Sequence, residues 1–229
     1  IPPVAPAPCF SIRKPAKRVH RLSDYVDQAI MPPQVAAALR EAVLSKANII
    51  VVGGTSSGKT TLVNALLTEV AATQDRVVIL EDTRELNCAA EDCVTLRTKP
   101  GFVSLADLVR STMRLRPDRI IVGEVRGAEA LDMLKAWNTG HPGGLATVHA
   151  NSARGALYRI EQLVQECVVT VQRRLIAEAI DLLVFLEGRG ASRKVTEVAR
   201  VEGLTLDGDY QLTPVFSQQH PLTTHRSTP

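Results

Sequence analysis

The segment Gly53-Gly54-Thr55-Ser56-Ser57-Gly58-Lys59-Thr60 decides the fold class, because it matches the phosphate-loop pattern G-x-x-x-x-G-K-[ST]. The apolar run 49–52 before it predicts a buried strand, and the apolar spacing over 60–73 predicts a helix after it. Glycines let the backbone turn so that successive N–H groups and the helix N-terminus face an anion. We therefore expect a loop that joins a strand to a helix and cradles phosphate groups.

Individual roles within this loop follow from its chemistry. The ammonium of Lys59 is expected to reach the β- and γ-phosphates of a nucleotide, and the hydroxyl of Thr60 to ligate Mg²⁺. The alternative is a glycine-rich turn that binds nothing, and the flanking strand and helix argue against it. The residues expected to bind the nucleotide are Gly53, Gly54, Thr55, Ser56, Ser57, Gly58, Lys59, Thr60 and Thr61.

Strands and helices alternate along most of the chain. This alternation predicts an α/β fold with a mostly parallel sheet, helices on both faces and a C-terminal antiparallel β extension. Ligands of such folds bind beyond the carboxyl ends of the strands, so the chemical residues should follow strands. Strands are expected over 49–52, 77–80, 120–122, 145–148, 181–187, 194–202 and 210–216, and helices over 34–46, 60–73, 105–115, 128–138, 156–166 and 172–180.

Acidic residues follow two of the expected strands. Glu81, Asp82 and Glu85 come directly after the strand over 77–80, where they can orient or deprotonate a water molecule, and a solvated acidic loop is the alternative. Glu124 follows the strand over 120–122 and resembles the Walker B arrangement, although Gly123 occupies the usual Asp position. Glu124 is expected to hold Mg²⁺ through water or to polarise the attacking water, and an acidic strand cap is the alternative.

Two histidines flank the strand over 145–148. His149 follows it, so we expect its imidazole at the edge of the site, where it can sense a γ-phosphate. His141 is expected at the opposite end or in the preceding loop. A lone histidine is often structural, and that alternative stays open for both.

Arginines cluster around the strand over 120–122. Most of them are expected to be ion-paired or solvated, and some to face a neighbouring subunit, because phosphoryl transfer gains from a cation supplied from outside the core site. Their spacing does not indicate which one would act there. The arginines concerned are Arg110, Arg114, Arg116, Arg119 and Arg126.

Composition limits the function classes. The 229 residues are 45% hydrophobic and 3% aromatic, and 27 basic against 24 acidic residues give a net charge of +3. A mild charge and few aromatic residues argue against direct nucleic-acid binding. No apolar stretch approaches the roughly 18 residues of a membrane span. The four cysteines (Cys9, Cys88, Cys93 and Cys167) form no C-x-x-C pair and are expected to be free thiols in a reducing compartment.

The chain divides into three parts by composition. Residues 1–23 are rich in proline and basic residues, and we expect them to be a connector from an N-terminal domain that is missing here. Residues 24–217 carry the regular pattern of the nucleotide-binding domain. Residues 218–229 are polar, contain two prolines and are expected to be a flexible tail.

The motifs, taken in order, resemble those of the secretion ATPase superfamily, which includes type II and type IV secretion and pilus motors. There they are called the Walker A motif, the Asp box, the Walker B motif and the His box. The detail is most similar to the conjugal-transfer branch of TrbB-like traffic ATPases. The resemblance rests on Phe10–Pro15, Glu81–Leu86, Arg116–Gly127, Thr139–Gly143 and His149–Asn151.

This resemblance implies a RecA-like domain that forms the C-terminal half of a subunit in a hexameric ring. It implies ATP and Mg²⁺ as cofactors, Arg13 as a further residue that reaches the phosphates, and Glu85 and Glu124 in metal and water handling. With the residue-level reasoning, the expected catalytic residues are Lys59, Glu85, Glu124 and His149, and the expected metal ligands are Thr60 and Glu124.

The expected function is Mg²⁺-dependent ATP hydrolysis that powers pilus assembly or substrate transfer in a type IV secretion or conjugation apparatus. The protein is expected in the cytoplasm, held peripherally at the inner membrane by partner proteins of the secretion system. A nucleotide-gated scaffold with little turnover is the alternative from another class. A GTPase is disfavoured because no N-K-x-D segment is present, and a DNA pump is disfavoured by the composition.

Overall fold

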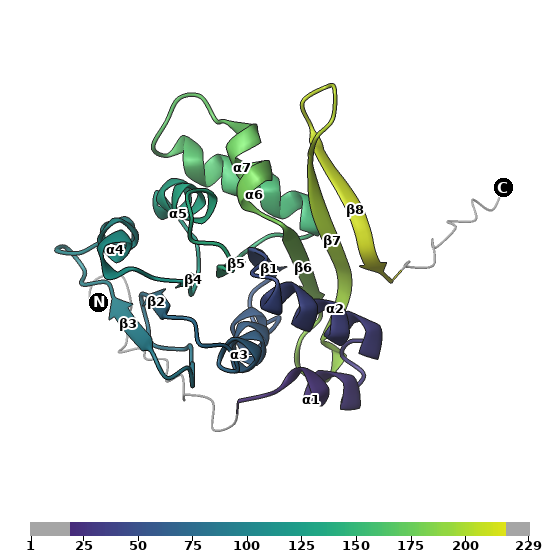
Figure 1. The fold of residues 1–229 in the computed structure, drawn as a ribbon. Coiled ribbons are helices and arrows are strands. Elements are labelled where there is room, and N and C mark those ends of the chain that lie inside the picture. Colours follow the sequence, from purple (N-terminus) through teal and green to yellow (C-terminus); the bar gives the residue numbers. More distant parts are fainter. Residues whose placement is uncertain (1–18, 219–229) are drawn as a thin grey trace, which may run out of the picture.

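The computed structural model of the chain describes residues 19–218. They form one eight-stranded sheet with strand order β3-β2-β4-β5-β1-β6-β7-β8 (Figure 1). Strands β3 through β6 in this order pair in parallel, and β7 and β8 add to them in antiparallel fashion. The strands are β1 Ile49–Gly53, β2 Val77–Glu81, β3 Cys93–Arg97, β4 Arg119–Val122, β5 Leu145–Val148, β6 Leu182–Glu187, β7 Lys194–Leu204 and β8 Tyr210–Ser217.

Helices cover both faces of this sheet, as expected. One layer contains three helices and the other contains four, on opposite sides of the strands in Figure 1. The first layer is α1 Leu22–Asp27, α2 Pro33–Leu44 and α3 Lys59–Val70, and the second is α4 Leu105–Thr112, α5 Glu129–Asn138, α6 Ala153–Gln165 and α7 Arg173–Ala179, with short 3₁₀ turns at Met113–Leu115 and Gly190–Ser192.

The central strands are apolar throughout because they are buried on both faces. In β1, Ile50 and Val52 contribute to the core under α4–α7, whereas Ile49 and Val51 contribute to the core under α1–α3. Successive side chains of a strand point to opposite faces, so a parallel sheet between two helix layers needs an uninterrupted apolar run. This confirms the expected α/β class with its antiparallel extension.

Two elements were not expected from the sequence. β3 is an edge strand whose side chains are only partly buried, so its apolar pattern is weak. α1 is short, but its Leu22 and Tyr25 are buried in the core. The boundary placed between residues 23 and 24 therefore falls within α1. The rest of the expected connector, with Arg13 and Cys9, and nearly all of the expected tail lie outside the described residues.

A buried ion cluster holds the edge of the sheet where the strands begin. The guanidinium of Arg119 is fully buried and donates from Nε to Asp75 Oδ2 at 2.7 Å, and Lys46 Nζ lies 2.7 Å from Asp75 Oδ1. Burial alone would raise the pKa of Asp75, but hydrogen bonds from Lys46, Arg119 and Thr73 outweigh it and lower that pKa. The cluster thus anchors β4 to the loop before β2.

Replacing Asp75 with asparagine is expected to lower the free energy of unfolding by about 3 kcal/mol, because it leaves Arg119 charged and buried without a counter-ion. Folding lowers the pKa of the Asp75 carboxyl. Its ion pairs therefore stabilise the folded state at pH values above the unfolded-state pKa of Asp75, and this stabilisation is lost as the pH falls through the folded-state pKa. Urea unfolding at pH 7 measures the loss in the free energy of unfolding. Asp207→Asn, in an exposed turn, is the control, and equal stability of both variants would contradict this role.

Within residues 19–218, none of the helices combines the length and the apolar character that crossing a membrane requires.

Candidate active site

Four functional segments meet at the edge of the sheet where the parallel strands end. Gly53 and Glu81 are the last residues of β1 and β2, His149 follows β5 directly, and Glu124 lies two residues beyond β4. Because β2, β4, β5 and β1 are successive neighbours in the sheet, the loops after them are adjacent. The strand order therefore brings together residues that are far apart in the sequence.

The phosphate loop runs from Gly53 into the first turn of α3. Gly58 adopts a φ of +96°, which favours glycine, and is the N-cap of the helix. The side chain of Lys59 folds back over the loop, and its Nζ donates to the carbonyl oxygens of Gly53 at 2.9 Å and Gly54 at 3.0 Å. These two hydrogen bonds hold the Lys59 ammonium beside the first residues of the loop.

A chain of polar contacts leads from this ammonium to the Walker B carboxylate. Nζ of Lys59 lies 3.2 Å from His149 Nδ1, and His149 Nε2 lies 2.8 Å from Glu124 Oε1. The other carboxylate oxygen, Glu124 Oε2, lies 2.7 Å from NH2 of Arg126. Both oxygens of Glu124 therefore have a partner, and His149 bridges the cation and the carboxylate.

The charges in this chain influence one another. Burial lowers the pKa of Lys59, and the nearby Glu124 counteracts only part of that effect. Burial and the charge of Lys59 lower the pKa of His149 despite the attraction of Glu124. A neutral His149 with its proton on Nε2 can donate to Glu124 and accept from Lys59 through Nδ1. This tautomer satisfies both contacts.

The Asp box is organised around Glu81. This carboxylate is 2% exposed, and its Oε1 accepts from the backbone N–H groups of Glu85 at 2.9 Å and Leu86 at 2.8 Å. Its Oε2 is buried and has no hydrogen-bond partner. Burial raises the pKa of Glu81 in spite of the two backbone bonds. Glu81 thus shapes the loop that carries Glu85 and keeps one oxygen available.

Gly123, which replaces the usual Walker B aspartate, makes room for Glu81. A Cβ at position 123 would lie 3.1 Å from Cγ and 3.6 Å from Oε1 of Glu81. The buried carboxylate of Glu81 therefore occupies space that a larger residue at 123 would need. β2 supplies a carboxylate beside the position where β4 lacks one.

These segments surround a polar cavity of about 590 Å³. Of the residues expected to bind or act, Thr55, Ser56, Gly58, Lys59, Thr60, Thr61, Glu85, Glu124 and His149 line it. Gly53, Gly54 and Ser57 lie in the loop beneath, and Arg13 lies outside the described residues. The remaining lining residues are Glu81, Asp82, Thr83, Gly123, Arg126, Thr147 and Arg193.

Two lining residues were missed by the sequence analysis. Thr147 is a buried polar residue inside an apolar strand, and its hydroxyl donates to Gly123 O at 2.7 Å. That polar interruption of an apolar run is a signal that could have marked it. Arg193 lies in the turn before β7, in no motif, and only the tertiary structure brings it to the cavity.

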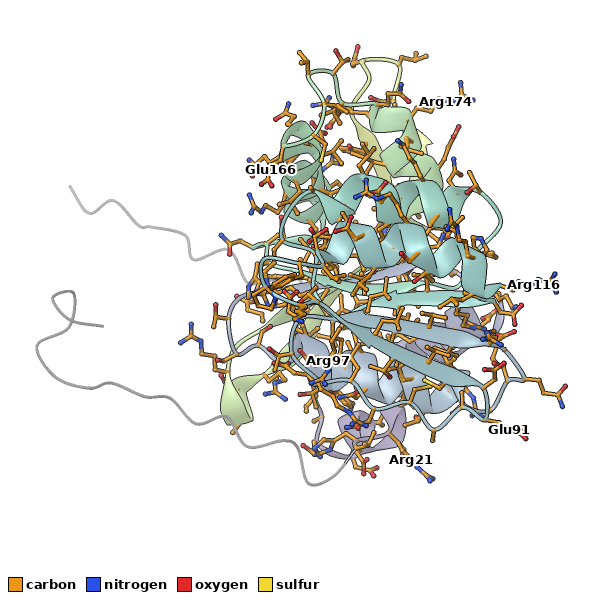
Figure 2. All side chains as sticks on the ribbon, turned by 90° about the vertical axis from the view of Figure 1, so that its left-hand side faces the viewer. Arg21, Glu91, Arg97, Arg116, Glu166 and Arg174 are labelled. Carbon is orange, nitrogen blue, oxygen red and sulfur yellow. The ribbon has the colours of Figure 1, made fainter. Side chains whose placement is uncertain are left out.

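The expected arginine cluster is dispersed by the fold. Arg126 alone among the five lines the cavity, whereas Arg119 is buried at the opposite edge of the sheet. Arg116 extends outward beyond the body of the protein in Figure 2. His141 also belongs to the opposite edge, with Nδ1 2.9 Å from the carbonyl oxygen of Pro117.

Several known proteins are similar to this chain in sequence. It is 52% identical over 205 residues to the conjugal transfer protein TrbB of Rhizobium radiobacter, an alignment that covers 89% of this chain and 63% of that protein. It is 36% identical over 231 residues to the type IV secretion system protein PtlH homolog of Bordetella bronchiseptica, covering 85% and 68%. The chain thus spans somewhat under two thirds of the length of its TrbB relatives.

Solved structures are similar in fold. The VirB11 ATPase of the Brucella suis type IV secretion system, in complex with sulphate, matches with a TM-score of 0.67 and 29% identity over 82% of this chain and 65% of that one. The pilus retraction motor PilT with bound ADP matches with a TM-score of 0.61 at 20% identity over 90% and 56%, which supports the fold alone. The family model described as Type II/IV secretion system protein matches residues 1–186. This chain therefore belongs to the type II/IV secretion system protein family.

Proposed function

We propose that this chain hydrolyses ATP to ADP and phosphate in the presence of Mg²⁺. The observation that carries the proposal is the contact chain Lys59–His149–Glu124 beside the phosphate loop, inside one polar cavity. Phosphoryl transfer to water needs a cation and amides for the phosphates and a group that orients the water. The similar VirB11 ATPase was solved in complex with sulphate, which is also a tetrahedral oxyanion.

Phosphate binding is supported by the loop and by α3. The N-terminus of α3 directs its unpaired N–H groups and its positive dipole end into the cavity, next to Lys59 and Thr60. Two N–H groups of the Lys59 ammonium face the carbonyl oxygens of Gly53 and Gly54, and the third faces His149 Nδ1 at 3.2 Å. We infer that the ammonium exchanges some of these contacts for the β- and γ-phosphate oxygens when ATP binds.

The donor set also fits Mg²⁺. Within residues 19–218 no three His, Cys, Asp or Glu side chains gather as a ready-made metal site. In nucleotide sites Mg²⁺ is commonly held through water, one or two side chains and phosphate oxygens. The hydroxyl of Thr60 and the carboxylate of Glu124 would hold it, and the unpartnered Oε2 of buried Glu81 fits a water molecule of its shell. Bound there, Mg²⁺ would neutralise charge that develops on the phosphate oxygens.

The water-handling role belongs to Glu124, with Glu85 as a second candidate. To accept a hydrogen bond from the attacking water, a Glu124 oxygen must exchange His149 or Arg126 for that water. The side chain of Arg126 is 62% exposed, so its ion pair with Glu124 is weak and is the contact that we expect to be released. His149 then remains on Glu124 Oε1 and keeps the carboxylate oriented toward the γ-phosphate.

The biological output is inferred from the relatives. Conjugal transfer and type IV secretion proteins match most of this chain, so we propose that hydrolysis drives pilus assembly or substrate transfer in such a system. The full-length protein would act as a homohexameric ring in the cytoplasm, bound peripherally to inner-membrane partners. The connector would end before α1, the ATPase domain would run from Leu22 to Ser217, and residues 218–229 would form the tail. Arg13 of the connector would reach the phosphates.

One observation favours a second candidate, a nucleotide-gated scaffold with little turnover. Both oxygens of Glu124 are engaged by protein groups, and an enzyme that keeps these contacts would bind ATP without activating water. Single-turnover assays with excess protein, Mg²⁺ and labelled ATP separate the two functions, with the mass in solution recorded alongside. ADP formation within minutes supports the ATPase, and stable bound ATP supports the scaffold.

A further inference from the structure

Arg193 places its guanidinium over the phosphate loop. A Cβ added to Gly58 would lie 2.5 Å from Cζ and Nε and 2.8 Å from NH1 of Arg193. The guanidinium therefore fills the space beside the first turn of α3, and it lines the same cavity as Lys59 and Thr61. Glycine at 58 serves two purposes, a positive φ and room for this side chain.

Within the part of the chain that the structure describes, no acceptor faces this guanidinium. Nε of Arg193 is buried and has no hydrogen-bond partner, and no carboxylate among residues 19–218 pairs with the side chain. A guanidinium carries five N–H donors, and a buried donor without an acceptor costs stability. By contrast, Arg126, the other arginine of the cavity, is paired with Glu124 at 2.7 Å.

The strand order places Arg193 on the far side of the loop from the water-handling residues. Glu124 and His149 follow β4 and β5, which lie on one side of β1, whereas Arg193 precedes β7 on the other side, beyond β6. A nucleotide in the cavity would direct its γ-phosphate toward Glu124. The portion of its phosphate chain beside Gly58 and Thr61 would then face Arg193.

We propose that Arg193 binds the α- and β-phosphates of the nucleotide from the side of the C-terminal antiparallel extension. The proposal rests on the proposed function, because it assigns a further binding residue to the same site. The planar fork of donors in arginine matches pairs of phosphate oxygens. The extension is thereby part of the nucleotide site, in addition to completing the sheet.

Calorimetric titration of the chain with Mg²⁺-ADP and with magnesium pyrophosphate tests this assignment. Arg193→Ala is expected to lower the affinity for both ligands by about tenfold or more, as for the loss of hydrogen bonds to a charged group. Arg193→Lys keeps the positive charge and should retain part of the affinity for both ligands. Arg200→Ala is the matched control, since Arg200 is an exposed arginine of β7 outside the cavity.

Each other outcome overturns the proposal in an identifiable way. A loss of ADP affinity without a loss of pyrophosphate affinity would place Arg193 at the ribose or base. If Arg193→Ala behaves like Arg200→Ala while Lys59→Ala loses ADP, only the assignment of Arg193 fails. If Lys59→Ala retains ADP, the proposed function fails and this inference with it. If Arg193→Ala unfolds at a lower temperature than the unaltered chain in the absence of ligand, the titrations are repeated with Arg193→Gln.

Discussion

Replacing Lys59 with alanine is expected to lower ATP affinity by roughly 100-fold or more and to abolish measurable turnover, because the charge-assisted contacts of its ammonium to phosphate oxygens are lost. The rest of the site would stay in place. His149 and Glu124 keep their mutual contact at 2.8 Å, and the backbone of the loop is set by Gly58 and α3. Titration with ATP and a steady-state phosphate-release assay measure the two effects.

The folded state itself should tolerate this substitution. Burial lowers the pKa of Lys59, so the charged ammonium is held in the cavity at a cost in free energy. The alanine variant is therefore expected to unfold at the same temperature or a higher one. Lys135→Ala, an exposed position in α5, is the control. Normal turnover by Lys59→Ala would refute the assignment of this loop to ATP.

Replacing Glu124 with glutamine is expected to slow hydrolysis by roughly 10²–10⁴-fold while leaving ATP affinity within about threefold, since a group that orients or deprotonates water is lost. The amide keeps the size of the side chain and can still accept a hydrogen bond from His149 Nε2. Its NH₂ group would face Arg126 in place of a carboxylate oxygen, which also weakens that contact. Single-turnover rates and ATP titration separate the chemical step from binding.

Glu91→Gln provides the matched control for Glu124→Gln. Glu91 is an exposed carboxylate before β3, and its side chain lies at the periphery of the molecule in Figure 2. The Glu91→Gln variant should hydrolyse ATP at the same rate as the unaltered chain. Hydrolysis by Glu124→Gln at the unaltered rate would transfer the water-handling role to Glu85 or Glu81. Equal loss of binding and rate would instead show that Glu124 acts mainly on the bound metal and phosphates.

The central strands were the most predictable part of the fold. Both bounds of four strands, β1, β2, β4 and β5, lie within one residue of the expected ranges, because each strand is an apolar run buried on both faces. Helix starts were less certain, since they depend on caps. α6 begins at Ala153, where the hydroxyl of Ser152 accepts from Gly155 N at 2.9 Å, three residues before the expected start.

Elements with weak local signals were missed for physical reasons. β3 lies at the edge of the sheet with partly exposed side chains, so neither an apolar run nor a buried alternation marks it. α1 is only six residues long and owes its position to the burial of Leu22 and Tyr25. Isolated helices of this length are unstable, so tertiary packing decides whether they form.

The sequence by itself determined the α/β class, the phosphate loop and which strands are followed by chemical residues, because spacing and periodicity are local properties. Only the tertiary structure decided how those residues combine. The strand order places His149 between Lys59 and Glu124, lets Glu81 fill the space at Gly123, and brings Arg193 across the loop. These juxtapositions depend on long-range strand pairing, which no local pattern encodes.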